Sequence, residues 1–199
     1  MTIGIVFYST YGTTHALAQE VAAGIASAGG DAALRRVPEL MPDEAMDDNA
    51  KAAAEAQSDI AFADVEELPE FDGIILGSPT RFGNRAAQLS QFIDQTGPLW
   101  QSGRLVGKPV GFFTGAATMH GGHESTILTM STWAYHQGMV IVPAGYANEQ
   151  MGSTRTGGGP YGPTHLSPTD GSKTSLSDEE ISIARGYGEH FATIAAKLA

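Results

Sequence analysis

The sequence predicts an α/β protein: a three-layer domain with a doubly wound parallel sheet of five strands in the order 2-1-3-4-5. Short apolar segments such as 3–8 lack strict apolar and polar alternation, which is typical of strands covered on both faces. They alternate with segments of helical spacing, which indicates right-handed crossovers and a parallel sheet. A hydroxyl-rich turn at 9–14 follows the first strand and fits a switch point beside the first and third strands. With 199 residues and no low-complexity linker, 1–199 is predicted to form a single domain.

The strands and helices are expected to alternate along the chain. The first helix starts near His15 and stops at Gly29-Gly30, and a Ser-x-x-Glu box at Ser177 starts the last helix. The second strand is charged and suits an outer position, and an acidic insertion containing a helix follows it. The segment 144–174 is a long glycine-rich loop, which is unusual in a compact domain. The expected strands are 3–8, 33–37, 71–77, 109–114 and 139–143, and the remaining helices lie within 42–57, 85–94 and 124–137.

The composition excludes several classes of function. A net charge of −11 argues against a nucleic-acid surface and against docking to anionic membranes. Eleven of the 22 acidic residues lie in 43–72, which indicates a solvated acidic face. Because the chain has no cysteine, any redox chemistry must come from a bound cofactor. No signal-peptide pattern or apolar stretch of about 18 residues occurs, so we expect no membrane insertion and a cytoplasmic location.

The hydroxyl-rich turn after the first strand is the clearest candidate binding site. Its hydroxyl residues Ser9, Thr10, Thr13 and Thr14 surround Gly12, between a buried strand and a helix N-terminus. The backbone N–H groups of such a turn point toward one position and favour an anion, which we expect to be a phosphate monoester. The turn has no Lys or Arg, as nucleoside triphosphate hydrolysis would need, so it is suited to hold a phosphate and not to transfer one. An ordinary capped turn is the alternative interpretation.

Several segments, in the right order and nearly end to end, resemble the WrbA family of FMN-dependent NAD(P)H:quinone oxidoreductases. The segments are 9–14, 79–84, 94–97, 99–100, 136–143 and 160–162. The resemblance implies a flavodoxin-like fold, FMN as the cofactor, NADH or NADPH as the electron donor and a quinone as the substrate. It also implies a homotetramer.

The resemblance places flavin contacts in three loops and at one histidine. Arg81, in the second loop, could add positive charge near the pyrimidine side of the ring, although a surface ion pair is its alternative role. The third loop departs from the family, because Ala116 and Ala117 stand where relatives carry hydroxyls. The predicted cofactor-binding residues are Ser9, Thr10, Tyr11, Gly12, Thr13, Thr14, Pro79, Thr80, Arg81, Phe82, Gly83, Asn84, Thr114, Gly115, Ala116, Ala117, Thr118, Gly121, Gly122 and His136.

A nicotinamide and a quinone are flat rings that must stack on the flavin, which requires an open face walled by aromatic side chains. We expect Tyr11, Phe82, Trp100, Tyr146 and His136 to form this wall. The resemblance puts Tyr11 at a nicotinamide position and Trp100 on the substrate side. His136 is the predicted catalytic residue, which would hydrogen-bond a quinone oxygen or donate a proton. Without the resemblance, a core or capping histidine is the alternative.

These features predict an enzyme that transfers two electrons from NAD(P)H through FMN to quinones, giving hydroquinone. One pocket for both ligands predicts ping-pong kinetics. A flavodoxin-type FMN electron carrier and a flavin-dependent regulatory or scaffolding protein are the alternatives. Nothing in the sequence decides between NADH and NADPH.

Two apparent motifs do not change this prediction. His120 and His123 have a spacing that could bind a metal, but Glu124 is the only carboxylate nearby, and we predict no metal site. Residues 157–162 match G-x-G-x-x-G by letters, but no strand precedes them and Pro160 prevents a helix from starting there.

Overall fold

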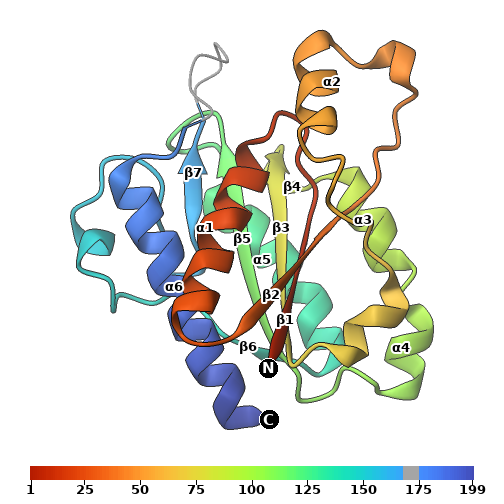
Figure 1. The fold of residues 1–199 in the computed structure, drawn as a ribbon, viewed down its shortest axis with the longest axis vertical. Coiled ribbons are helices and arrows are strands. Elements are labelled where there is room, and N and C mark those ends of the chain that lie inside the picture. Colours follow the sequence, from red (N-terminus) through yellow and green to blue (C-terminus); the bar gives the residue numbers. More distant parts are fainter. Residues whose placement is uncertain (168–174) are drawn as a thin grey trace.

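The computed structural model describes residues 1–167 and 175–199, and a central β-sheet lies between two layers of helices (Figure 1). The strands are β1 (Thr2–Phe7), β2 (Asp31–Arg36), β3 (Gly73–Arg81), β4 (Asn84–Arg85), β5 (Pro109–Ala116), β6 (Val140–Ile141) and β7 (Thr164–Leu166). The α-helices are α1 (Thr13–Ser27), α2 (Asp48–Glu55), α3 (Ala87–Asp94), α4 (Gly97–Ser102), α5 (His123–Gln137) and α6 (Asp178–Leu198). Short 3-10 helices are η1 (Asp43–Ala45), η2 (Val65–Glu70) and η3 (Glu149–Gly152).

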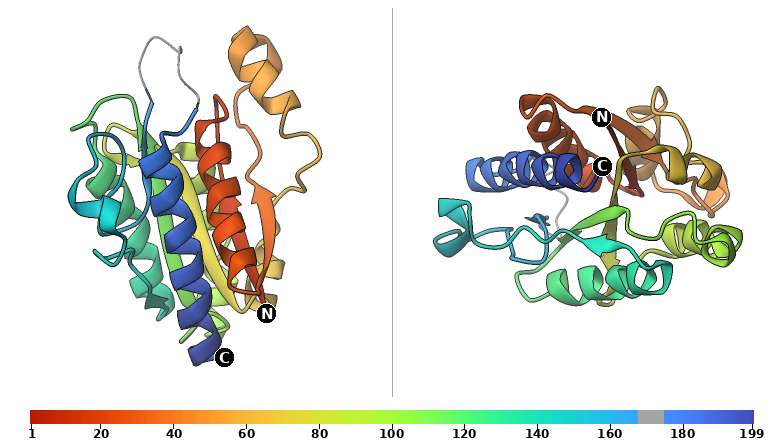
Figure 2. Two further views of the ribbon diagram at one scale, coloured as in Figure 1. Left: turned by 60° about the vertical axis from the view of Figure 1, so that its left-hand side comes forward. Right: turned by 90° about the horizontal axis from the view of Figure 1, so that it is seen from below.

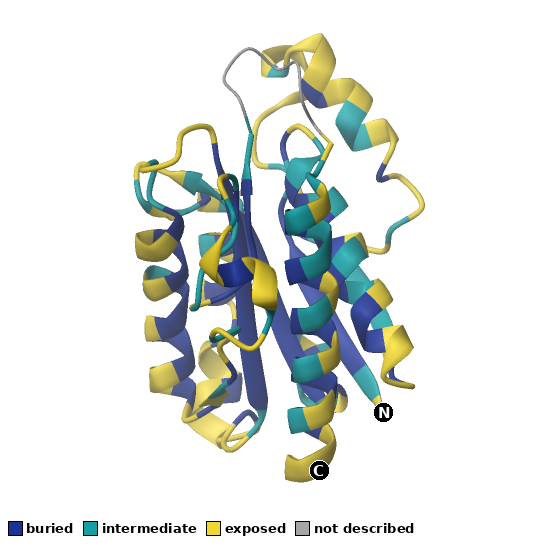
Figure 3. Ribbon diagram, turned by 90° about the vertical axis from the view of Figure 1, so that its left-hand side faces the viewer, coloured by how far each residue is buried: buried dark blue, intermediate teal, exposed yellow. Residues whose placement is uncertain are grey.

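The main strands are hydrogen-bonded in the order β2-β1-β3-β5-β6, and all of these pairs are parallel. The charged strand β2 lies at the edge of the sheet, as expected. Helices α1 and α6 cover one face (Figure 2), where Leu17, Phe191 and Ile5 belong to one buried apolar cluster. Helices α3, α4 and α5 cover the other face, where Trp133 joins the cluster that contains Phe112. The sheet is therefore buried on both sides, and the outer faces of the helices are exposed (Figure 3).

Among the described residues, the sheet has seven strands, two more than the five expected. Strand β3 continues beyond Gly77 to Arg81, and the chain turns back into the antiparallel strand β4. Phe82 and Gly83 make this turn with φ angles of 54° and 80°, the left-handed geometry of a two-residue β-hairpin. In the sequence, Pro79 and Gly83 indicate only a break in the strand. Strand β7, which pairs with β5, is three residues long and too short to show periodicity.

The helices α6 and α2 both start at a polar cap. The Ser177 hydroxyl accepts the N–H of Glu180, whose carboxylate accepts the N–H of Ser177, which confirms the capping box of α6. In the acidic segment, the Asp47 carboxylate accepts the N–H of Ala50 at 2.8 Å and starts α2. Residues 168–174 of the expected glycine-rich loop lie outside the described residues. Among the described helices, none is both long and apolar enough to cross a bilayer.

Candidate functional site

Three loops meet at the carboxyl edge of the sheet, after the adjacent strands β1, β3 and β5. They comprise residues 9–12, 82–83 and 117–122. Side chains join them to one another. Arg81 Nη2 donates to Thr10 Oγ1 at 2.7 Å, which joins the first two loops. Thr80 Oγ1 donates to the carbonyl of Gly121 at 3.4 Å, which joins the second and third loops. The three predicted segments therefore lie together.

The loop after β1 offers unused hydrogen-bond donors. Within the described part of the chain, no acceptor meets the backbone N–H of any residue from 9 to 14. Gly12, with a φ of 84°, directly precedes α1, whose N-terminus carries a partial positive charge. The Thr14 hydroxyl is buried and also lacks a partner among the described residues. Since buried polar groups are normally paired, these donors fit an anionic ligand such as the phosphate monoester of FMN.

The β3–β4 hairpin presents Phe82 at its tip. The Phe82 side chain is fully exposed, although its left-handed backbone is uncommon for a bulky residue. Thr80 fixes the base of the turn, because its Oγ1 accepts the N–H of Gly83 at 3.1 Å and the hydroxyl of Thr126 at 2.9 Å. Strained backbone of this kind is concentrated at functional sites. The hairpin thus holds an aromatic ring in solvent beside the other two loops.

The loop after β5 packs tightly on the hairpin. Gly122 has a φ of 98°, and a Cβ atom there would lie 2.8 Å from Cα of Gly83. The close approach therefore needs glycine at position 122. The Thr114 hydroxyl donates its proton to the Ser78 carbonyl at 2.6 Å, inside the sheet, so toward a ligand it can only accept.

A chain of hydrogen bonds that the sequence does not predict leads from Arg81 into the protein. Thr10 Oγ1, which accepts from Arg81, donates to the hydroxyl of Tyr8 at 3.1 Å, and this hydroxyl donates to Glu39. Gln88 of α3 donates both to the Tyr8 hydroxyl, at 3.1 Å, and to Glu39. Tyr8 follows β1 and Glu39 follows β2 at the same edge, and this shared position is the signal that the sequence carries.

Tyr11 connects the loop after β1 to the acidic segment. Its hydroxyl donates to Oδ2 of Asp47 at 3.0 Å, and this hydrogen bond raises the pKa of Tyr11. Gln57 of the same segment donates to the carbonyl of Ser9 at 3.4 Å. Helix α2 therefore lies beside the loop after β1 (Figure 1).

Two of the predicted aromatic residues lie at the opposite edge of the sheet. His136 is exposed in the last turn of α5, about 20 Å along the helix from its first residue. Trp100 is exposed on α4, whose preceding residue Thr96 accepts from Nε1 of Trp133 in the second half of α5, at 2.9 Å. Within one chain, the structure thus brings Tyr11 and not His136 or Trp100 to the three loops.

A buried carboxylate holds the elements beside the third loop. Glu180 accepts the N–H groups of Gly157, Leu166 and Ser177 at 2.8 to 2.9 Å and lies 2.9 Å from Nδ1 of His165. Burial raises the pKa of Glu180, but the hydrogen bonds from His165 and from the backbone outweigh it and lower the pKa to about 2. No sequence signal pairs His165 with Glu180, since they come from different elements, β7 and α6.

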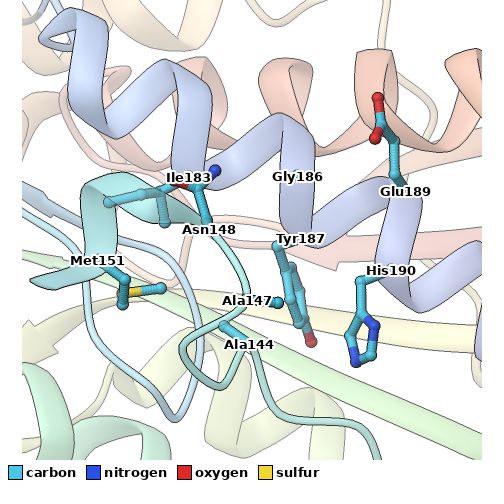
Figure 4. A pocket seen from close by; sticks show the side chains of 9 residues that line it. All are labelled: Ala144, Ala147, Asn148, Met151, Ile183, Gly186, Tyr187, Glu189 and His190. Atoms are coloured by element: carbon cyan, nitrogen blue, oxygen red, sulfur yellow. The ribbon is translucent and has the colours of Figure 1, made fainter.

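A separate groove of about 270 Å³ lies between α6 and the segment after β6 (Figure 4). It is lined by Ala144, Ala147, Asn148, Met151, Ile183, Gly186, Tyr187, Glu189 and His190. The predicted substrate residue Tyr146 is exposed in this same segment. No residue of the three loops lines the groove, so it is distinct from the loop site. Within the described ranges, no three side chains of His, Asp or Glu are grouped as metal ligands.

The chain is similar to several known proteins over its full length. A family described as NADPH-dependent FMN reductase matches residues 1–153. A protein of Aromatoleum aromaticum named NAD(P)H dehydrogenase (quinone) is 48% identical over 202 residues, which cover 100% of this chain and 97% of that protein. A protein of the same name from Trichlorobacter lovleyi is 48% identical over 98% of both chains.

Solved structures show that the fold is flavodoxin-like. A WrbA-like flavodoxin from Agrobacterium tumefaciens superimposes with a TM-score of 0.67 at 24% identity, over 100% of this chain and 99% of the other. Flavodoxin 2 from Bacillus cereus gives a TM-score of 0.65 at 17% identity, over 98% and 99%.

Proposed function

Because the chain belongs to the NADPH-dependent FMN reductase family, we propose that it binds FMN at the three loops and transfers two electrons from NADH or NADPH to a quinone, giving hydroquinone. The observation that carries the proposal is the set of unpaired amides at 9–14 with the buried Thr14 hydroxyl, which fits a phosphate monoester. The reaction is supported by relatives about half identical and named NAD(P)H dehydrogenase (quinone). When bound, FMN supplies the hydride chemistry, and the protein supplies position and electrostatics.

Each loop contributes differently to the proposed site. Residues 9–14 hold the phosphate, and the hairpin and the loop after β5 hold the ring. Arg81 has no carboxylate within ion-pair distance among the described residues, so its charge is available to a ligand. Tyr11 and Phe82 are exposed and give flat rings a surface to stack on. Nicotinamide and quinone would use this same surface in turn, which leads to a ping-pong mechanism.

We infer that the active form is a homotetramer in which neighbouring subunits complete the flavin site. His136 and Trp100 are exposed and lie at the edge of the sheet opposite the three loops of their own chain, so they can serve a flavin site only across a subunit interface. Tyr146 is also exposed, in the segment beside the separate groove. In this arrangement, His136 of the partner subunit hydrogen-bonds a quinone oxygen or donates a proton to it. Light scattering coupled to chromatography tests the assembly, and a monomer at working concentration would overturn it.

The experiment for the function is anaerobic titration of the FMN-loaded protein. We expect the flavin absorbance to bleach with NADH or NADPH and to recover with benzoquinone, without any partner protein. Initial rates at several quinone concentrations should give parallel double-reciprocal lines. Flavin that binds but is reduced only by a separate redox protein would indicate an electron carrier. Failure of FMN to bind the folded protein would reject the proposal.

A further inference from the structure

The hydrogen-bond chain from Arg81 to Glu39 joins an exposed guanidinium to a half-buried carboxylate through two buried hydroxyl residues. Tyr8 is 4% exposed and Thr10 is 8% exposed, so water does not compete for either hydroxyl. Glu39 accepts, besides the Tyr8 hydroxyl and Gln88, the backbone N–H groups of the two residues that follow it, at 2.7 and 3.1 Å. The carboxylate is therefore held from four directions.

The charges fix the direction of every proton in this chain. An ionised carboxylate only accepts and a guanidinium only donates. The Tyr8 hydroxyl must then donate to Glu39, and the Thr10 hydroxyl must donate to Tyr8 and accept from Arg81. Hydrogen bonds in which the donor or the acceptor is ionised, as at the two ends of this chain, are stronger than neutral ones, and connected hydrogen bonds reinforce one another. The arrangement has a single hydrogen-bonding pattern and leaves no free hydroxyl proton on Thr10.

The protonation states of Tyr8 and Glu39 do not change near neutral pH. Burial, followed by the hydrogen bond to Glu39, raises the pKa of Tyr8 to about 12. Burial acts to raise the pKa of Glu39, but the hydrogen bonds from Tyr8, Gln88 and the backbone outweigh it and lower the pKa. Tyr8 thus remains a donor and Glu39 an acceptor over the range in which an enzyme would work.

The hydrogen-bond chain restrains the Arg81 side chain but does not neutralise its charge. One guanidinium nitrogen donates to Thr10, and the other donates to the carbonyl of Thr80 at 2.9 Å. A guanidinium has five N–H donors, so others remain for a ligand. Glu39 is separated from the guanidinium by two hydroxyl groups, which is too far for a direct ion pair. The side chain is therefore oriented while its charge stays available.

We propose that Tyr8 and Glu39 are positioning residues that hold the Arg81 guanidinium between the first two loops, where it favours the negatively charged, reduced state of the bound cofactor. This inference rests on the proposed function, because it takes FMN as the ligand of the loops. Tyr8 and Glu39 act through Thr10 and Arg81 and need not touch the ligand. When this hydrogen-bond chain is broken, the guanidinium is free to rotate into solvent. The binding of reduced FMN is then weakened more than the binding of oxidised FMN.

The test is the midpoint potential of the bound flavin in Tyr8→Phe, measured by equilibration with a reference dye. We expect reduced FMN to bind three- to tenfold more weakly relative to oxidised FMN, because the Arg81 guanidinium is no longer held in one orientation. This ratio corresponds to a potential about 15 to 30 mV lower for a two-electron couple. Tyr187→Phe is the matched control. It also removes a buried tyrosine hydroxyl, which accepts from Phe112 N and donates to the Val142 carbonyl, away from the loops.

A double-mutant cycle separates positioning from a merely structural role. In an Arg81→Met background, Tyr8→Phe should leave the potential unchanged, because the group that it orients is gone. A full effect of Tyr8→Phe in that background would overturn the proposal. An unchanged potential in Tyr8→Phe would also overturn the proposal, provided that the unaltered protein binds FMN and reduces quinone. The proposed function would then still stand. If Tyr8→Phe does not fold, Thr10→Val breaks the same chain and carries the same expectation.

Discussion

Phe82 combines complete exposure with a left-handed backbone, and each property alone is unfavourable for a large aromatic residue. A left-handed conformation costs roughly 1 to 2 kcal/mol for a residue with a Cβ atom, and Asn tolerates it better. We therefore expect Phe82→Asn to raise the free energy of unfolding by about 1 kcal/mol and the melting temperature by roughly 2 to 4 °C. Turnover with quinone should fall, because the aromatic face is lost.

Thermal unfolding of the flavin-free protein and kcat/KM with benzoquinone measure the two effects of this change. Phe82→Leu is the control, since it removes the aromatic ring but keeps the strained backbone. An equal gain in stability in Phe82→Leu would contradict the explanation.

Thr14 carries a buried hydroxyl for which the described residues provide no partner. Thr14→Val keeps the shape and removes the hydroxyl, so the flavin-free protein should lose no stability. A hydrogen bond to a charged phosphate contributes roughly 1.5 to 3 kcal/mol, so the Kd for FMN should rise at least about tenfold. Fluorescence titration of FMN measures it, with the exposed Thr132→Val as a control. Unchanged affinity would mean that Thr14 does not contact the phosphate.

At the scale of elements, the packing of α1 on α6 depends on glycine. A Cβ atom at Gly188 would lie 2.2 Å from the carbonyl of Val21, so Gly188→Ala must push the helices apart. We expect a loss of roughly 1 to 3 kcal/mol in denaturant unfolding. Gly186→Ala, on the same helix, meets only the end of the Asn148 side chain and should be neutral or slightly stabilising. Equal effects of the two changes would contradict the packing explanation.

Because of the Glu180 network, the stability of the elements around β7 depends on pH in the acid range. The folded-state pKa of about 2 lies below the ordinary value of 4.5, so the stabilisation is complete above pH 4.5 and is lost as the pH falls from about 4.5 to 2. The linked free energy is roughly 3 kcal/mol. Unfolding curves between pH 6 and 2 should show this loss, and Glu180→Gln should be less stable at neutral pH and lack that part of the dependence. An identical pH dependence in Glu180→Gln would show that other groups are responsible.

The sequence predicts elements well where the signals are local. The strand 3–8 with its turn and the Ser177 capping box are confirmed, because apolar runs and caps are set by adjacent residues. Strands β4 and β7 escape prediction because two or three residues form a strand only through pairing with β3 and β5. The hairpin also needs a left-handed Phe82, a conformation that the residue type disfavours.

At the scale of the whole molecule, the sequence places the three loops together because parallel strands end at one edge. The position of His136 also follows from the sequence. Helix α5 starts at that edge and has 15 residues, so its last turn, with His136, must lie at the opposite edge. For the Glu39–Tyr8 contact, the only sequence signal is that the two residues follow adjacent strands at the same edge, because their spacing along the chain does not indicate a hydrogen bond.

Strand β5 shares one of its edges between two short partners: β6 pairs with Pro109 and Val110, and β7 pairs with residues 114–116. The segment between β6 and β7 is therefore a suitable place to cut the polypeptide. If the chain were cut there, the β1 loop would lie on one fragment and β7 and α6 on the other. Each fragment would expose apolar surface until the two associate. Such a split protein should regain its yellow colour only on reassembly, which would make flavin uptake a built-in reporter of fragment complementation.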